Sequence, residues 1–166
     1  KPVLYVCNVD EKSLVEGNQY VEHVKEAVKD EEAEVISVAA GVEAEIAELD
    51  NKEERQMFLD DIGLEESGLT RLIRAAYKLL DLETFFTVGP DEVRAWTVKR
   101  GSTAPEAGGV IHSDFQRGFI KVEVIKYEDF IKHKSEAACR EAGKINLEGK
   151  NYIVKDGDLM NFKFNV

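Results

Sequence analysis

The first half of the chain alternates short apolar runs with helical periodicity. Residues 3–7 (VLYVC) and 35–39 (VISVA) are continuous apolar runs, which are typical of strands buried on both faces. Residues 20–28 carry apolar side chains at helical spacing between these runs, and residues 42–49 continue the pattern after them. An acidic helix is expected over 51–61. The order of strand, helix, strand and helix predicts the last units of a doubly wound α/β sheet.

Ser67 is a plausible N-cap for a helix whose apolar stripe we expect to consist of Leu69, Leu72, Ile73, Ala76 and Leu80.

Beyond this helix the pattern changes to short strands separated by turns, which predicts two domains, residues 1–81 and 82–166. Residues 85–88 and 93–98 are expected to form a hairpin around a turn at residues 89–91. The second domain is predicted to be an α+β module in which two helices cross a small mixed sheet.

The remaining elements of this module follow from local patterns. Ser102 or Thr103 can cap a helix with Pro105 in its first turn, and Gly143 can end a helix over 134–142. The other expected features are a strand with Ile120, Val122 and Val124 on its buried face, a strand pair over 145–147 and 152–154, and a last strand with Met160, Phe162 and Phe164 on one face.

Charge is distributed unevenly over the 166 residues, whose formal net charge is −11. Residues 1–80 carry 19 acids against 9 bases, whereas residues 81–166 carry 14 against 13, so the second half can still form a basic face. No apolar stretch is long enough for a membrane helix, and two isolated cysteines predict neither a disulfide framework nor a zinc site. We expect a cytoplasmic protein.

The first apolar run ends at Asn8 and is followed by an acid three residues later, in an N-x-x-E pattern. Ligands of doubly wound sheets bind beyond the carboxyl ends of the strands, where Asn8 and the segment 39–41 are both expected to lie. Asn8 could join the two strand ends around a flat heterocycle. Alternatively, Asn8 only caps the following turn, as Asn often does.

Several long segments, among them KPVLYVCNVDE, AAGVEAEIAEL and LEGKNYIVKDGDLMNFKFNV, resemble the carboxy-terminal part of YchF-type Obg-like ATPases, which are TRAFAC P-loop NTPases. The resemblance runs over essentially the whole chain. It implies the end of a P-loop NTPase sheet in residues 1–81 and a β-grasp TGS domain in residues 82–166. Because the chain enters a strand directly after Lys1-Pro2, we expect it to be part of a longer protein.

The resemblance also implies the nucleotide-binding residues. Relatives that prefer GTP use N-K-x-D, in which the Asp pairs with guanine, whereas this chain has N-V-D-E. A longer, misplaced carboxylate no longer favours guanine, which fits the family's preference for ATP. The implied contacts are Asn8, Val9 and Glu11 in the fourth nucleotide-binding motif and Ala39, Ala40 and Gly41 in the fifth.

Two local patterns suggest catalysis and are rejected. GLEESGLT has glycines at P-loop spacing, but Leu69 replaces the phosphate-binding Lys. Three adjacent residues, His112, Ser113 and Asp114, cannot form a catalytic relay. A P-loop ATPase also needs a phosphate-binding loop with its Lys, and in the family that the chain resembles this loop lies before the position of Lys1. The resemblance therefore implies that ATP and Mg²⁺ are bound by the longer parent protein and that this chain alone is inactive.

A TGS domain implies a regulatory role that faces RNA or the ribosome. The module is nearly neutral, so ordinary surface charge is an alternative reading of its basic residues, and a non-catalytic β-grasp interaction module is the alternative function. Trp96 could stack on a base if it is exposed. The candidate phosphate contacts are Arg94, Lys99, Arg100, Arg117, Lys121 and Lys126.

Overall fold

The structure is a computed structural model that describes residues 2–89 and 92–165. The chain divides into two compact units, Lys1–Leu80 (unit 1) and Asp81–Val166 (unit 2). Of the turn expected at 89–91, Pro90 and Asp91 lie outside the described residues.

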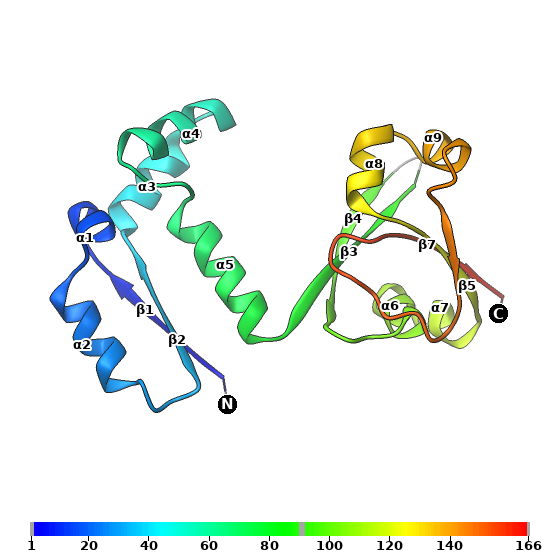
Figure 1. Cartoon of the computed structure of the whole chain (residues 1–166), viewed down its shortest axis with the longest axis horizontal. Coiled ribbons are helices and arrows are strands. Elements are labelled where there is room, and N and C mark those ends of the chain that lie inside the picture. Colours follow the sequence, from blue (N-terminus) through cyan, green and yellow to red (C-terminus); the bar gives the residue numbers. More distant parts are fainter. Residues whose placement is uncertain (1, 90–91, 166) are drawn as a thin grey trace. The chain divides into compact units, whose positions relative to one another are not determined.

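Unit 1 is built on a pair of parallel strands, β1 and β2, whose register runs from Val3 opposite Ala33 to Asn8 opposite Val38. In Figure 1, α2 lies on one side of this pair and α5 on the other. The predicted strands and helices are confirmed, and α1 is an additional short helix that the sequence did not predict. The elements are β1 (Val3–Asn8), α1 (Glu11–Glu16), α2 (Gln19–Ala27), β2 (Ala33–Val38), α3 (Ala40–Glu48), α4 (Lys52–Asp61) and α5 (Gly68–Leu79).

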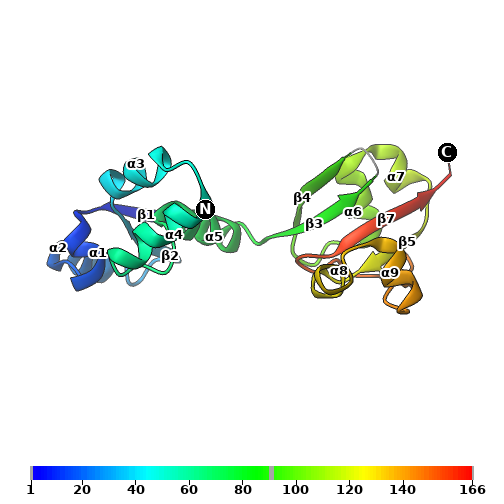
Figure 2. The same ribbon diagram turned by 90° about the horizontal axis from the view of Figure 1, so that it is seen from above.

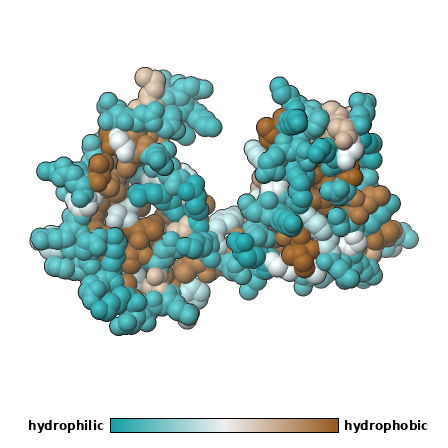
Figure 3. All heavy atoms as spheres, in the orientation of Figure 1, coloured by the Kyte–Doolittle hydropathy of each residue, from teal (hydrophilic) through white to brown (hydrophobic). Residues whose placement is uncertain are grey.

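Helix α5 begins after Ser67 as predicted, and the Ser67 hydroxyl accepts a hydrogen bond from Thr70 N. Its expected apolar stripe is only partly buried, because Leu69, Ile73 and Leu80 are each more than half exposed. Gly68 and Ala75 are its buried residues, so small side chains let the helix approach the strands closely. Figure 3 shows brown, apolar patches among the teal of unit 1.

Unit 2 contains a mixed sheet of five strands in the order β4-β3-β7-β5-β6. The hairpin of β3 and β4 is antiparallel as predicted, and β3 also lies parallel to β7. The elements are β3 (Leu82–Val88), β4 (Val93–Lys99), α6 (Ala104–Ile111), α7 (Ser113–Arg117), β5 (Phe119–Ile125), α8 (Tyr127–His133), α9 (Glu136–Glu141), β6 (Asn146–Glu148) and β7 (Leu159–Phe164).

Helices cover both faces of this sheet, with α6 and α7 on one face and α8 and α9 on the other (Figure 2). The larger core is centred on Phe85 and Val122, both fully buried, and the smaller one contains Ile125, Cys139 and Leu159. Burial raises the pKa of the Cys139 thiol, so this side chain behaves as a small apolar residue.

One core position was predicted wrongly in β5. The register of β5 against β7 shifts between Phe119 and Lys121, so the strict alternation of faces is broken at Ile120. Phe119 therefore enters the core at 6% exposure, whereas Ile120 is 56% exposed. Val122 and Val124 are buried as predicted.

Two further expectations for unit 2 were wrong. Two helices were expected, but the described part of the unit has four. Of the two additional helices, α7 directly follows α6 and α8 directly follows β5. Residues 152–154 do not pair with β6. Instead, Ala104 N donates to Tyr152 O and Val154 N to Ser102 O, so this segment bonds to the residues that precede α6.

The start of α6 predicts an acid-sensitive contribution to stability. The Glu106 carboxylate accepts hydrogen bonds from the backbone N–H and the hydroxyl of Thr103, and these bonds lower the pKa of Glu106. A lowered carboxylate pKa stabilises the fold above the ordinary value of about 4.3, and the contribution is lost as the pH falls through the lower folded value.

Glu106→Gln should keep the hydrogen bonds to Thr103 at the start of α6 but has no carboxylate that can be protonated. Between pH about 6 and about 3, the urea midpoint should therefore fall less in Glu106→Gln than in the wild type. Fluorescence of Trp96, the only tryptophan, reports unfolding of unit 2 alone. Equal decreases in both proteins would contradict the expectation.

Candidate functional site

The carboxyl ends of β1 and β2 meet at Asn8. The Asn8 Oδ1 accepts a hydrogen bond from Ala40 N at 3.0 Å, and Val9 N donates to Val38 O at 2.8 Å. Parallel pairing brings Asn8 opposite Val38, so the two strand ends lie side by side. A side-chain amide thus joins segments 32 residues apart in the sequence.

The alternative reading of Asn8 as a local cap is wrong, because Asp10 has that role. Asp10 is the N-cap of α1, and its Oδ1 accepts from Ser13 N at 2.8 Å. Hydrogen bonds from the Ser13 side chain and backbone lower the pKa of Asp10. Asn8 therefore remains available for its tertiary contact.

Val9 and Glu11, the other residues of the fourth motif, flank this cap. Val9 is half-buried, and Glu11 is exposed at the first position of α1. A shallow depression of about 400 Å³ lies beside them, lined by Cys7, Asn8, Val9, Asp10, Asn18, Tyr20, Val21 and Val24.

The segment 39–41 lies at the carboxyl end of β2 and begins a helix. Ala39 is the N-cap of α3 and is 2% exposed, so its side chain is covered. Ala40 and Gly41 are exposed in the first turn of α3. A Cβ built on Gly41 would meet no atom within 4 Å, which leaves open space above its backbone for a flat group.

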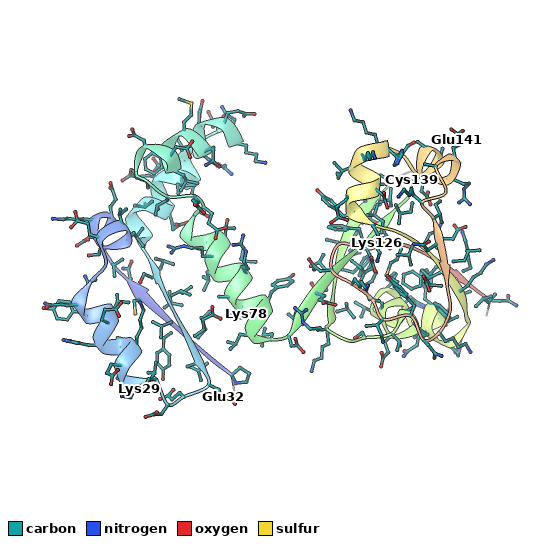
Figure 4. The ribbon with its side chains drawn as sticks, viewed as in Figure 1. Lys29, Glu32, Lys78, Lys126, Cys139 and Glu141 are labelled. Carbon is teal, nitrogen blue, oxygen red and sulfur yellow. The ribbon has the colours of Figure 1, made fainter. Side chains whose placement is uncertain are left out.

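A larger hollow of about 890 Å³ lies at the opposite, amino ends of the strands. Its lining includes Glu31, Glu32 and Glu34, with Lys78 contributed by α5 (Figure 4). The carboxylates would repel phosphate groups, so the strand ends at Asn8 are the better candidate for a nucleotide.

The two rejected motifs have structural roles. In GLEESGLT, Gly68 begins α5, and its N–H donates to the Glu43 carboxylate at 2.6 Å. Glu43 thus has a specific partner that the sequence did not reveal. The His112 Nδ1 accepts from Asp114 N at 3.2 Å and caps α7.

The basic candidates of unit 2 differ in how strongly they are held. Arg100 pairs with Asp81 and Glu83, both at 3.0 Å, and Arg117 pairs with Asp114 at 2.8 Å. The other exposed candidates are Arg94, Lys99 and Lys121.

Trp96 does not offer a free stacking face to a nucleic-acid base. It is half-buried against the core, its Nε1 donates to Thr87 Oγ1 at 2.9 Å, and the Arg94 guanidinium lies 4.1 Å from the ring centroid. Arg94 therefore already has a cation-π partner.

Lys126 is not free to bind phosphate, contrary to the sequence prediction. Its ammonium donates to Asp158 Oδ1 at 2.5 Å and to the Tyr152 hydroxyl at 2.8 Å. Burial opposes the charge of Lys126, but these hydrogen bonds and the charge of Asp158 outweigh it and raise the pKa of Lys126. We therefore exclude Lys126 from the candidate phosphate contacts.

A cationic pair was missed by sequence reasoning. Arg140 and Lys163 flank Glu123 at 3.5 and 3.4 Å. Burial opposes the charge of Glu123, but the two cations outweigh it and lower its pKa. Lys163 is opposite Lys121 in the sheet, and only the register of β5 and β7 reveals this.

Across residues 2–89 and 92–165, no group of three or more His, Cys, Asp or Glu side chains is placed to hold a metal ion. None of the helices in those ranges is long and apolar enough to cross a membrane.

Comparisons with known proteins agree with the resemblance seen in the sequence. Residues 82–165 match the family YchF-GTPase_C, described as "Protein of unknown function (DUF933)". The chain is 56% identical over 166 residues to the ribosome-binding ATPase YchF of Haemophilus ducreyi, covering 100% of this chain and 45% of the relative. It is 46% identical over 168 residues to the Obg-like ATPase 1 of Homo sapiens, covering 99% and 42%.

A solved structure, that of the Schizosaccharomyces pombe YchF GTPase, matches with a TM-score of 0.83 and 34% identity, over 98% of this chain and 43% of that chain. The chain therefore spans less than half the length of these relatives. Because the family match covers residues 82–165 and the relatives align along the whole chain, the chain belongs to the YchF family.

Proposed function

We propose that this chain is the base-recognition end and the TGS domain of a longer P-loop ATPase that associates with ribosomes and prefers ATP over GTP. The observation that carries the proposal is the hydrogen bond between Asn8 and Ala40, which joins the two strand ends where a nucleotide base would lie. The names of the relatives, ribosome-binding ATPase and Obg-like ATPase, support the same assignment.

The residues at the strand ends fit a flat base. Asn8 fixes the start of α3, and the open backbone at Gly41 leaves room for a ring to approach. Val9 and Glu11 replace the Lys and Asp of the guanine-reading pattern, so guanine loses the bidentate acceptor that would select it. Adenine is the base that this arrangement is proposed to hold.

The phosphates and Mg²⁺ would be held by the rest of the longer protein. The present sequence contains no G-x-x-x-x-G-K-[ST] motif. In the most similar segment, GLEESGLT, the N–H of Gly68 at the start of α5 already donates to the Glu43 carboxylate and is not free to bind a phosphate. We therefore propose that hydrolysis requires the longer chain and that the 166 residues alone bind ATP weakly or not at all.

Unit 2 is proposed to be the TGS domain. The strand order β4-β3-β7-β5-β6, with β3 parallel to β7 and α6 packed on one face, is that of a β-grasp sheet, which supports this assignment. Its ribosome-facing role is proposed from the resemblance and from the names of the relatives, and a cytoplasmic location agrees with it. The proposed phosphate contacts are Arg94, Lys99, Arg100, Arg117 and Lys121.

The longer protein should bind ATP at least about tenfold more tightly than GTP, because only guanine needs the missing bidentate acceptor. Calorimetric titration of the longer protein and of the present chain with each nucleotide measures this. Equal or tighter binding of GTP would refute the proposed role of Glu11. Ribosome binding by a longer protein that binds neither nucleotide would favour the rival function, a non-catalytic interaction module.

Charge reversal tests the ribosome-facing surface. In the longer protein, the double variant Arg117→Glu, Lys121→Glu should weaken ribosome association about tenfold, because two phosphate contacts become repulsive, while ATP affinity stays unchanged. Lys132→Glu, Lys150→Glu is a matched control, since both side chains are exposed in unit 2. Co-sedimentation with ribosomes measures the effect. Equal weakening of ribosome association in both double variants would show that only the net charge of the protein matters, and would contradict a specific role of Arg117 and Lys121.

A further inference from the structure

Glu43 connects the first turn of α3 to the first turn of α5. Its Oε1 accepts from Gly68 N at 2.6 Å and its Oε2 from Leu69 N at 3.2 Å. The next N–H, that of Thr70, donates to the Ser67 hydroxyl. The first N–H groups of a helix lack partners within it and carry its positive dipole end, so a carboxylate is strongly favoured at this point.

The absence of a side chain at Gly68 permits this contact. A Cβ built on Gly68 would lie 2.8 Å from Glu43 Oε1 and 3.0 Å from Val38 Cγ1. The backbone of Gly68 is not in the left-handed region, so the role of this glycine is to allow the close approach of Glu43 and Val38, which a Cβ would have to displace.

The same turn of α3 contacts the end of β1. Ala40 N donates to Asn8, and Glu43 N donates to Ala39 O at 3.0 Å. The segment 39–41 is thus held from two sides, by Asn8 on β1 and through Glu43 by α5. Arg71, also on α5, donates from Nη2 to Ser37 O at 2.8 Å and ties the end of β2 to the same helix.

We propose that Glu43 is a positioning residue for nucleotide binding, which holds the segment 39–41 at the place where its backbone meets the base. The inference rests on the proposed function, because it requires a nucleotide at the strand ends. Glu43 itself does not touch the nucleotide. A helix cap without this role would change stability and leave nucleotide affinity unaltered.

The test uses the longer protein and ATP. Glu43→Ala should raise the Kd for ATP about tenfold, a loss comparable to that of one hydrogen bond, with a smaller effect on kcat than on KM. Glu45→Ala is the matched control, since it removes an exposed carboxylate from the same helix and should change the Kd by less than about twofold.

Two further variants keep the test decisive. Glu43→Gln keeps the length and one acceptor and should restore part of the affinity if Glu43→Ala folds poorly. Gly68→Ala should weaken ATP binding as Glu43→Ala does, and the double variant Glu43→Ala, Gly68→Ala should be no worse than either, because both disrupt one contact.

A lowered thermal stability with an unchanged Kd for ATP in Glu43→Ala, Glu43→Gln and Gly68→Ala would overturn the inference. If Asn8→Ala weakens binding while these three variants do not, the proposed function stands and only the role of Glu43 fails. A longer protein that binds no ATP at all would overturn both.

Discussion

Asp158→Asn is expected to lower the free energy of unfolding of unit 2 by about 3 kcal/mol. The Asp158 side chain is 1% exposed and accepts hydrogen bonds from Lys126, from the Tyr152 hydroxyl at 2.6 Å and from Lys155 N at 3.0 Å. An amide brings two donors into a site that already presents donors, and it leaves the ammonium of Lys126 without its counter-charge. Because the Lys126 side chain is 35% exposed, water partly solvates its unpaired charge. The expected loss of unfolding free energy is therefore at the low end of the range for a broken buried ion pair.

Urea unfolding followed by Trp96 fluorescence measures this change, since the tryptophan lies in unit 2. Asp114→Asn is the matched control, because it removes the same charge from the surface pair with Arg117 and should cost less than about 1 kcal/mol. Similar losses in the two variants would show that the buried network contributes no more than a surface ion pair.

Asn8→Ala in the longer protein is expected to raise the Kd for ATP about 10- to 30-fold, which corresponds to about 1.4 to 2 kcal/mol. The change removes the acceptor for Ala40 N and lets the two strand ends separate, so the proposed base site loses its fixed width. Titration with ATP measures the effect.

Asn51→Ala is the control for this prediction. Asn51 also accepts a backbone hydrogen bond, from Glu54 N at 2.8 Å, but it does so at the start of α4. This variant should lose stability through its helix cap and keep its ATP affinity. Equal weakening of ATP binding by both variants would attribute the effect to stability, and the strand-end site would lose its support.

The sequence predicted those features that depend on neighbouring residues. The positions of β1 and β2, the cap at Ser67 and the hairpin of β3 and β4 all follow from patterns within a few positions, and the structure confirms them. The expected burial of β1 and β2 on both faces was wrong, because every residue of these two strands keeps part of its surface exposed. The pairing of Asn8 with the second strand end was predicted because parallel strands bring their carboxyl ends together.

The missed features depend on contacts between distant segments. The bulge that exposes Ile120 is set by the pairing of β5 with β7, and alternation within β5 alone cannot reveal it. Glu43 is one acid among many until Gly68, 25 residues later, folds beside it. Lys126 looks like any surface lysine because its partner Asp158 lies 32 residues away.

The strand pair of unit 1 has a practical consequence for handling the protein. Within the described residues, β1 and β2 pair only with each other, so the outer edge of each presents backbone groups to which another strand can add. Val3 and Val6 on β1 are also exposed. We therefore expect unit 1 prepared in isolation to aggregate through strand addition, and a longer chain that covers these edges is preferable for biochemical work.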